Sequence, residues 1–415
     1  MIGDHRSGEG VTDPPDARDS SSSAAGVATT PAADTFDTAA VGTVATAHFV
    51  HDTYPAFIGT LLPLLIDKHG MSLAVAGGLA TAIRWPSVAQ PFLGYIADRT
   101  DARLLVIVPP VVTAIAISLL GVAPTYAALV ALLLIAGTSS AAFHPAAGAM
   151  VTRASGSQWG RASSYFMTGG ELGRAAGPIL IATTVAAVGL TGSWIAAVPG
   201  LLITLVAYAI LRTRAVTLGR SASPDDLWAA VRSRGRPLLL LAGIVLFRSL
   251  VIASFQTFVP TFLMEEGTSN LYAGFALSVY EIGGVVGAFV GGPLSDRFGR
   301  RTMMAVSQLT AGPVLFTALL LATEPIGLAL LAIGGLLALC AGPVQLTLVQ
   351  ELLPRNRGSA AGIVMFLGFE GQVIAVLAVG FLAELIGLKA ALGWSVLASM
   401  LSLPFTLLLP ETRRL

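Results

Sequence analysis

Three ionisable side chains lie close together near the start of the first long apolar stretch of the chain. His48, His51 and Asp52 are separated by three and four residues, which places them on one face of a helix. A carboxylate beside an imidazole in a partly dry cavity can take up and release a proton, because the two titrations are coupled. We therefore predict proton coupling by Asp52 and His48, with His51 as a substrate contact. The alternative is a fixed His–Asp bond that steadies the helix.

A second pair of charges, Glu171 and Arg174, lies three residues apart in another apolar stretch. One interpretation is an ion pair that lowers the cost of placing both charges in a membrane. The other is a switch, in which protonation of Glu171 frees Arg174 to hold an anion. Glu171 is accordingly the reserve candidate for proton coupling.

Five further polar residues within apolar stretches are candidates for substrate binding. Arginine suits bidentate recognition of a carboxylate or phosphonate. Ion pairs between these helices, Arg84–Glu370 or Arg248–Glu281, are an alternative that the sequence leaves open. His144 precedes Pro145, which frees a backbone carbonyl in the preceding turn, so this histidine could contact substrate or bond that carbonyl. The five candidates are Arg84, His144, Arg248, Glu281 and Glu370.

The composition places these groups in a membrane. Of the 415 residues, 54% are hydrophobic and 11% are charged, against about a quarter charged in a soluble domain. Too few charges remain to cover a soluble fold of this size, so the chain is predicted to be an integral membrane protein rather than a nucleic-acid binder or a disordered chain. The single cysteine, Cys340, excludes an intrachain disulfide.

Twelve apolar stretches are long enough to cross a bilayer as helices. They predict an all-α membrane protein with twelve transmembrane helices. Glycines within them, such as Gly283, Gly284, Gly287, Gly291 and Gly292, are typical of close helix packing. The predicted spans are 41–66, 72–97, 104–122, 126–150, 160–186, 192–212, 237–263, 271–294, 302–322, 326–350, 358–385 and 389–410.

Basic residues predict the orientation. With the N-terminus inside, 19 of the 21 basic residues at or beyond the ends of the predicted helices lie on the inner side, and only Lys68 and Lys389 lie on the outer side. Both termini are therefore predicted to be cytoplasmic, in the cell (plasma or inner) membrane. Residues 1–40 are rich in small and acidic residues and predict a disordered cytoplasmic tail.

An internal repeat divides the rest of the chain into two halves. Gly94-Tyr-Ile-Ala-Asp98-Arg99 matches Gly292-Pro-Leu-Ser-Asp296-Arg297 at an offset of 198 residues, and Pro145 matches Pro343 at the same offset. The repeat predicts two six-helix bundles in the same orientation, with a substrate path between them. The predicted domains are 41–212 and 237–415, joined by a cytoplasmic linker at 213–236.

The stretch from Gly292 to Arg301 resembles the signature loop of the major facilitator superfamily, and Gly94 to Arg103 resembles a degraded first copy of it. The resemblance implies the major facilitator fold and an inner gate built on these loops. The alternative is a turn that fixes the topology without gating. Asp98 and Asp296 would there accept bonds from arginines and backbone N–H groups across the interface of the halves. The residues implied in gating are Gly94, Asp98, Arg99, Gly292, Asp296, Arg297, Gly299, Arg300 and Arg301.

Several short motifs resemble the fosmidomycin-resistance branch of that superfamily. They are His48-Phe-Val-His-Asp52, Gln90-Pro-Phe-Leu-Gly94, Phe143-His-Pro145, Gly169-Gly-Glu-Leu-Gly173 and Gln350-Glu-Leu-Leu-Pro354. The resemblance covers about residues 45–412 and implies a proton-driven drug exporter.

We therefore predict a secondary transporter, a monomer that exports a small organic compound or drug, anionic compounds included, by proton antiport. An uptake symporter for an organic anion or sugar acid is the nearest alternative, and a transport-inactive sensor or scaffold comes from a different class. Neither a cofactor nor a nucleic-acid partner is expected, and no enzymatic motif is present in context. Two histidines three residues apart suit a metal poorly, so no metal site is expected.

Overall fold

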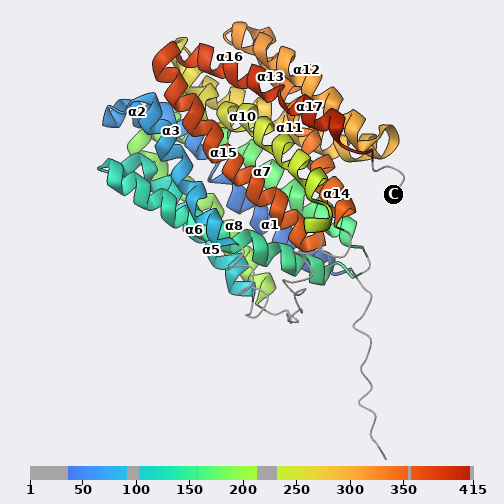
Figure 1. Cartoon of the computed structure of the whole chain (residues 1–415). Coiled ribbons are helices and arrows are strands. Elements are labelled where there is room, and N and C mark those ends of the chain that lie inside the picture. The colour runs from blue at the N-terminus through green and yellow to red at the C-terminus, as the bar shows by residue number, and fades with distance from the viewer. Residues whose placement is uncertain (1–35, 91–101, 157, 213–230, 354–356, 412–415) are drawn as a thin grey trace, which may run out of the picture. The chain divides into compact units, whose positions relative to one another are not determined.

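The computed structural model describes residues 36–90, 102–156, 158–212, 231–353 and 357–411, and these residues form helices and turns without a strand. The helices of residues 38–211 and those of residues 235–408 form the two halves of the fold (Figure 1). Most of the predicted tail, 1–35, and most of the predicted linker, 213–230, lie outside the described residues.

Eleven helical segments of the described chain are long and apolar enough to cross a membrane, and they coincide with eleven of the twelve predicted spans. The remaining prediction, 72–97, is described only as far as Gln90. The fold is therefore the all-α, two-bundle membrane fold that the sequence predicts.

The helices of the first half begin at Thr38, three residues before the predicted start of the first span. They are α1 Thr38–Thr53, α2 Phe57–His69, α3 Leu73–Thr81, η1 Ala82–Ala89, α5 Ala102–Ser118, η2 Leu119–Val122, α6 Tyr126–Ala154, α7 Trp159–Val188, η3 Leu190–Ala196 and α8 Ala197–Leu211.

The helices of the second half follow the same order of crossings. They are α10 Gly235–Glu265, α11 Asn270–Phe298, α12 Arg300–Leu320, α13 Pro325–Leu339, α14 Ala341–Leu352, α15 Arg357–Ile386, α16 Leu388–Ser399 and α17 Ser402–Leu408.

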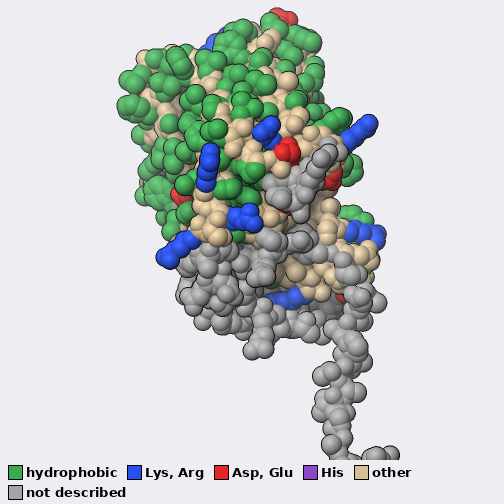
Figure 2. Space-filling view, turned by 45° about the vertical axis from the view of Figure 1, so that its right-hand side comes forward, with side chains coloured by type: hydrophobic (Ala, Val, Ile, Leu, Met, Phe, Trp, Pro, Cys, Tyr) green, Lys and Arg blue, Asp and Glu red, His purple; other side chains and the backbone are tan. Residues whose placement is uncertain are grey.

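Large apolar side chains cover the outside of the helices. Phe289 and Leu239 are 77% and 74% exposed, which is unfavourable in water but favourable against lipid. Figure 2 shows hydrophobic side chains over the upper part of one face, with most of its Lys and Arg side chains lower down. The exposed surface thus fits a bilayer.

The first crossing is interrupted directly after Asp52. Pro55 cannot donate the backbone hydrogen bond that would continue the helix, and α1 gives way to a turn before α2 begins at Phe57. Tyr54 anchors this break, because its hydroxyl donates to the Ala196 carbonyl (3.0 Å) and accepts from the Gly200 amide (2.9 Å). The break therefore has a fixed position beside the ionisable residues.

The two halves contact each other near one end of the fold. This end lies opposite the end that contains residues 38 and 408. Gly77 of α3 faces Gly380 of α15 so closely that a Cβ on Gly77 would lie 3.5 Å from the Gly380 Cα. Ser278 of α11 accepts from the Ile179 amide of α7 (3.0 Å). Glu384 of α15 accepts from the Ala74 amide of α3 (3.0 Å). These contacts hold the bundles together at this end.

Candidate functional site

A glycine seam brings α7 against α1 and positions the charged residues of both helices. A Cβ added to Gly169, Gly173 or Gly177 would collide with the α1 carbonyl oxygens of Ala45, Phe49 or Thr53, respectively. Only glycine permits this approach of two backbones.

The predicted α11 seam is also present at Gly283, Gly284, Gly287 and Gly291, where an added Cβ would meet α13 or Cys340. Gly292 has open space instead.

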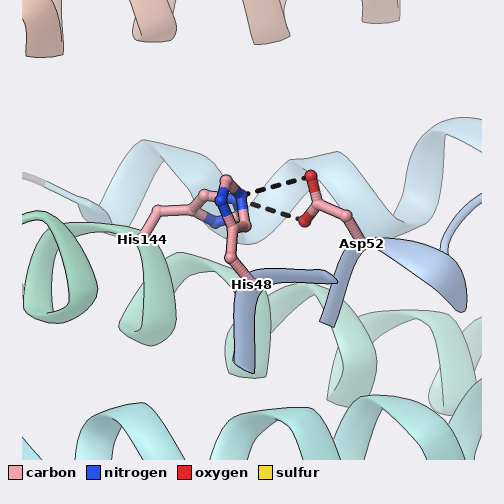
Figure 3. A group of neighbouring side chains, drawn as sticks. All are labelled: His48, Asp52 and His144. Atoms are coloured by element: carbon pink, nitrogen blue, oxygen red, sulfur yellow. Dashed lines mark ion pairs between the residues drawn. The ribbon is translucent and has the colours of Figure 1, made fainter. Parts of the chain in front are cut away.

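Asp52 is the centre of the cluster that this seam creates. Its Oδ2 atom lies 3.3 Å from Nε2 of His48 and 2.8 Å from Nη1 of Arg174, and its Oδ1 atom lies 3.5 Å from Nε2 of His144. Figure 3 shows both imidazole rings directed at the one carboxylate. The structure therefore brings His144 of α6 together with the predicted pair of α1.

The tautomers of both histidines follow from the partners of their other ring nitrogen. Nδ1 of His48 lies 2.7 Å from the Phe166 carbonyl oxygen, and Nδ1 of His144 lies 2.9 Å from the Ser140 carbonyl oxygen. A carbonyl oxygen only accepts, so each Nδ1 carries a hydrogen. In the neutral state each Nε2 is then a bare acceptor facing the Asp52 carboxylate.

Acceptors that face one another repel unless a proton lies between them. Each of the two Nε2–carboxylate contacts is attractive only when that nitrogen or the carboxylate oxygen is protonated. His48, Asp52 and His144 therefore form a site that needs added positive charge or added donors. Asp52 and His48 are both buried, so such a proton is shielded from bulk water.

Arg174 connects this cluster to the other acids. Its guanidinium pairs with Glu171 one turn earlier in α7 as well as with Asp52, and it interacts electrostatically with Glu281 of α11 in the second half. Glu281 accepts from the Gln256 side-chain amide (2.9 Å). Oε2 of Glu171 and Oε2 of Glu281 are buried without a partner. One guanidinium thus forms ion pairs with two carboxylates, those of Asp52 and Glu171.

The same three side chains could also hold a divalent metal ion. The ligand atoms of His48, Asp52 and His144 lie within 4.8 Å of one another, and hydrogen-bonded Nδ1 atoms are typical of metal-binding histidines. The prediction from the sequence considered only the two histidines of α1. The Arg174 guanidinium on the same carboxylate opposes a cation, so the geometry favours protons.

Among the described residues, the remaining predicted residues form no ion pair with Asp52, although the His51 ring packs edge-on against His144. His51 is fully buried, stacks on Phe143, and contacts the Thr113 hydroxyl through Nδ1 (3.4 Å). Arg84 donates to Gln372 of α15 (3.0 Å), and Glu370 accepts from Ser87 (3.3 Å). The structure therefore gives Arg84 an amide partner where an ion pair with Glu370 was an alternative.

The other alternative, an Arg248–Glu281 bridge, is also absent from the described residues. Arg248 is buried and donates to Oε1 of Gln345 (2.7 Å) and to the Ala338 carbonyl (2.5 Å), whereas Glu281 has Gln256 as its partner.

The second signature loop is held together by Arg300. This side chain pairs with Asp296 (2.5 Å) and Glu351 (3.0 Å) and donates to the Ser295 hydroxyl (2.5 Å). Asp296 therefore bonds within its own half, and the expected bond across the interface is not found among the described residues. The first copy, with Gly94, Asp98 and Arg99, lies outside them.

The other contacts of the loop residues also lie within the second half. Gly299 has a φ of +100° between α11 and α12, a conformation that favours glycine. The Arg297 guanidinium lies over the Phe298 ring, and Arg301 donates its backbone amide to Glu411 (3.2 Å).

Four polar partners of the site residues were not predicted from the sequence. Gln256, Gln345 and Gln372 lie inside apolar helices, and each accepts from or donates to a predicted site residue. Glu351, in the Gln350–Pro354 motif, pairs with Arg300. An amide side chain within a membrane helix costs free energy unless it forms hydrogen bonds. Glutamines in apolar stretches are therefore the sequence signal that could have pointed to these partners.

Replacing Gly173 by alanine is expected to destabilise the protein by about 1–3 kcal/mol, the usual cost of overpacking. The added methyl group would collide with the Phe49 carbonyl and push α1 away from α7. Thermal unfolding of the purified protein in detergent measures the effect. Gly78→Ala is the matched control, because a Cβ there meets nothing within 4 Å. Equal stability of the two variants would contradict the role of the seam.

The Major Facilitator Superfamily profile matches residues 44–272 and 245–415, and the chain belongs to this superfamily of membrane transporters. It is therefore a multi-pass transporter of small molecules and not an enzyme.

Two bacterial relatives extend over most of the chain. The "Uncharacterized MFS-type transporter YfnC" of Bacillus subtilis (strain 168) is 26% identical over 82% of this chain and 85% of its own length. The "Fosmidomycin resistance protein" of Escherichia coli (strain K12) is 24% identical over 90% of this chain and 93% of its own. The predicted resemblance to the fosmidomycin-resistance branch is confirmed.

Solved structures share the fold. A bacterial homologue of the human lysosomal transporter Spinster, in an inward-facing and occupied conformation, has a TM-score of 0.72 at 17% identity. The match covers 89% of this chain and 95% of that one. A D-xylose–proton symporter has a TM-score of 0.68 at 18% identity, covering 90% and 98%.

Proposed function

We propose that this protein is a proton-coupled antiporter that exports a small organic compound or drug. The observation that carries the proposal is the convergence of Nε2 of His48, Nε2 of His144 and the Asp52 carboxylate on one buried point. All three are acceptors when no proton is bound. The kinship with a fosmidomycin resistance protein supports export.

Competition at this point gives the direction of coupling. Hydrogen-bond donors or a cationic group of a substrate satisfy the same acceptors that protons satisfy, so the two bind mutually exclusively. By linkage, a transporter that alternates between the two loads exchanges substrate for protons. An inward proton gradient would then drive the substrate outward.

Arg174 keeps the empty site neutralised in this scheme. Its guanidinium is shared by Asp52 and Glu171, so a proton on Asp52 shifts it toward Glu171 and toward Glu281 of the other half. That shift would connect proton binding with the relative position of the two halves. In this scheme the loops around Asp98 and Asp296 form the inner gate. In the second half, the pair of Arg300 and Glu351 holds the loop in place.

A proton-coupled uptake symporter is the second candidate, and one observation favours it. Because Arg174 is held by Asp52, protonation of Asp52 would free the guanidinium for an anion, so that proton and anion bind together. A gallate transporter of Pseudomonas putida is 32% identical to this chain over 133 residues, which adds an aromatic acid to the candidate substrates.

Proteoliposomes under an imposed pH gradient separate the two functions. Fosmidomycin and gallate serve as first probes, and a pH-sensitive dye inside the vesicles reports proton movement. For an antiporter, an acidic lumen drives accumulation of the probe and the lumen becomes alkaline. Accumulation with an alkaline lumen would establish symport. Downhill flux that moves no protons would overturn proton coupling.

The proposed topology can be tested by labelling. With both termini and the linker in the cytoplasm of the cell membrane, a cysteine at Ser223 should react with a membrane-impermeant maleimide only after the cells are opened. The native Cys340 is buried, so it should give little background. Labelling at Ser223 in intact cells would reverse the orientation.

We further propose that the transporter acts as a monomer without a cofactor.

A further inference from the structure

The second half contains a buried arginine that has only neutral partners. Arg248 is 7% exposed and donates to the Gln345 amide oxygen and to the Ala338 carbonyl. No carboxylate of the described residues lies within ion-pair distance of it. A buried charge is costly in a membrane protein unless an opposite charge or a wet cavity compensates it. Arg248 is thus a buried cation that has no carboxylate partner among the described residues.

Two more hydrogen-bond donors near Arg248 are buried and unused. Nε2 of Gln345 has no partner, although Oε1 of the same side chain accepts from Arg248. The Tyr280 hydroxyl also has no partner, and Tyr280 packs against Gly335 of α13, three residues before Ala338, whose carbonyl accepts from Arg248. Gln345 and Tyr280 are 4% and 1% exposed. Guanidinium, amide and phenol together offer several N–H and O–H groups and no anionic acceptor.

The internal repeat relates this donor group to the acceptors around Asp52. Arg248 lies on α10 and Gln345 on α14, the helices that correspond to α1 and α6 at the offset of 198 residues. In the first half, α1 and α6 supply the acceptors Asp52 and His144. Equivalent helix pairs therefore carry opposite chemistry, with acceptors in one half and donors in the other.

We propose that Arg248, Gln345 and Tyr280 form a binding subsite for one oxyanion group, a carboxylate or phosphonate, of the transported compound. The guanidinium supplies the charge, and the amide and hydroxyl complete the hydrogen bonds to the oxygens. A compound with an acidic group at one end and donors at the other then binds both halves at once. The place of this subsite in transport rests on the proposed function, but its binding does not.

Anion binding to the purified full-length protein in detergent tests the subsite. Methylphosphonate and acetate are added at constant ionic strength, with ethylammonium as the cationic control, and the thermal unfolding midpoint is followed. A ligand that binds the folded state raises the midpoint. We expect a rise with the two anions and none with ethylammonium. Equal effects of all three would overturn the proposal as a salt effect.

Four variants locate the binding. Gln345→Glu places a carboxylate on Arg248, so it should raise the midpoint of the free protein and abolish the response to anions. Gln345→Leu and Tyr280→Phe should each weaken the anion by about tenfold, which is the value of a charge-assisted hydrogen bond. Arg234→Gln, at the exposed start of α10, removes a charge elsewhere and should respond like the wild type.

The outcomes separate this inference from the proposed function. An anion response that survives in Gln345→Glu overturns the subsite, even where a pH gradient still drives transport. An anion response that is lost in Gln345→Glu and kept in Asp52→Asn supports the subsite, even where proton coupling fails in vesicles.

Discussion

Vesicles that contain Asp52→Asn should lose accumulation driven by a pH gradient and keep exchange of substrate down its own gradient. Asparagine preserves the shape of the side chain, and its amide can donate to Nε2 of His48 or His144 in place of a proton. The cluster therefore keeps its geometry while the proton site disappears. Counterflow and pH-driven uptake, measured on the same vesicles, give the two readings.

Two further variants distinguish the roles within the cluster. His48→Ala should shift the pH optimum and lower the rate without abolishing coupling, because His144 and Asp52 remain in contact. Glu171→Gln should leave coupling intact. If Asp52→Asn retains pH-driven accumulation, the assignment to Asp52 fails. If Glu171→Gln alone loses it, the proton is carried on α7.

Replacing Arg174 by glutamine should destabilise the protein by about 3 kcal/mol, because the buried Asp52 then faces Glu171 without a cation between them. This is the lower end of the range for breaking a buried ion pair, since the Arg174 side chain is 32% exposed and partly screened. The midpoint of thermal unfolding in detergent measures the loss.

Charge balance supplies the control for Arg174. The double variant Arg174→Gln/Glu171→Gln removes one charge of each sign and should recover most of the stability. Arg232→Gln, at an exposed position before α10, should change the stability by no more than about 0.5 kcal/mol. A single Arg174 variant as stable as Arg232→Gln would show that Arg174 does not hold the cluster together.

The transmembrane helices could be predicted because a bilayer imposes a length and a hydrophobicity on each crossing. The described helix ends differ from the predicted ends by a few residues, as at Thr38 and Gly235. The pairing of His48 with Asp52 was equally accessible, since both lie on one helix and the spacing of four residues fixes their distance.

Partners on different helices could not be predicted in this way. His144 reaches Asp52 and Arg84 reaches Gln372 only through the packing of separate helices, and spacing within one helix does not encode that packing. The sequence left the substrate or an acid of another helix, Glu281, as the partner of Arg248, because charge is conspicuous in an apolar stretch. In the structure, Arg248 instead donates to Gln345, a neutral side chain that composition alone does not single out.

The glutamate that caps α12 has a consequence for biosynthesis. Glu411 accepts from the backbone amides of Arg300 and Arg301, and it follows Arg300 by 111 residues. At roughly 5–20 residues per second, about 6–22 seconds pass between the synthesis of α12 and that of its cap. During this interval the start of α12 is uncapped beside the signature loop, so the loop reaches its final hydrogen bonding only after five more helices, α13 to α17, have been made.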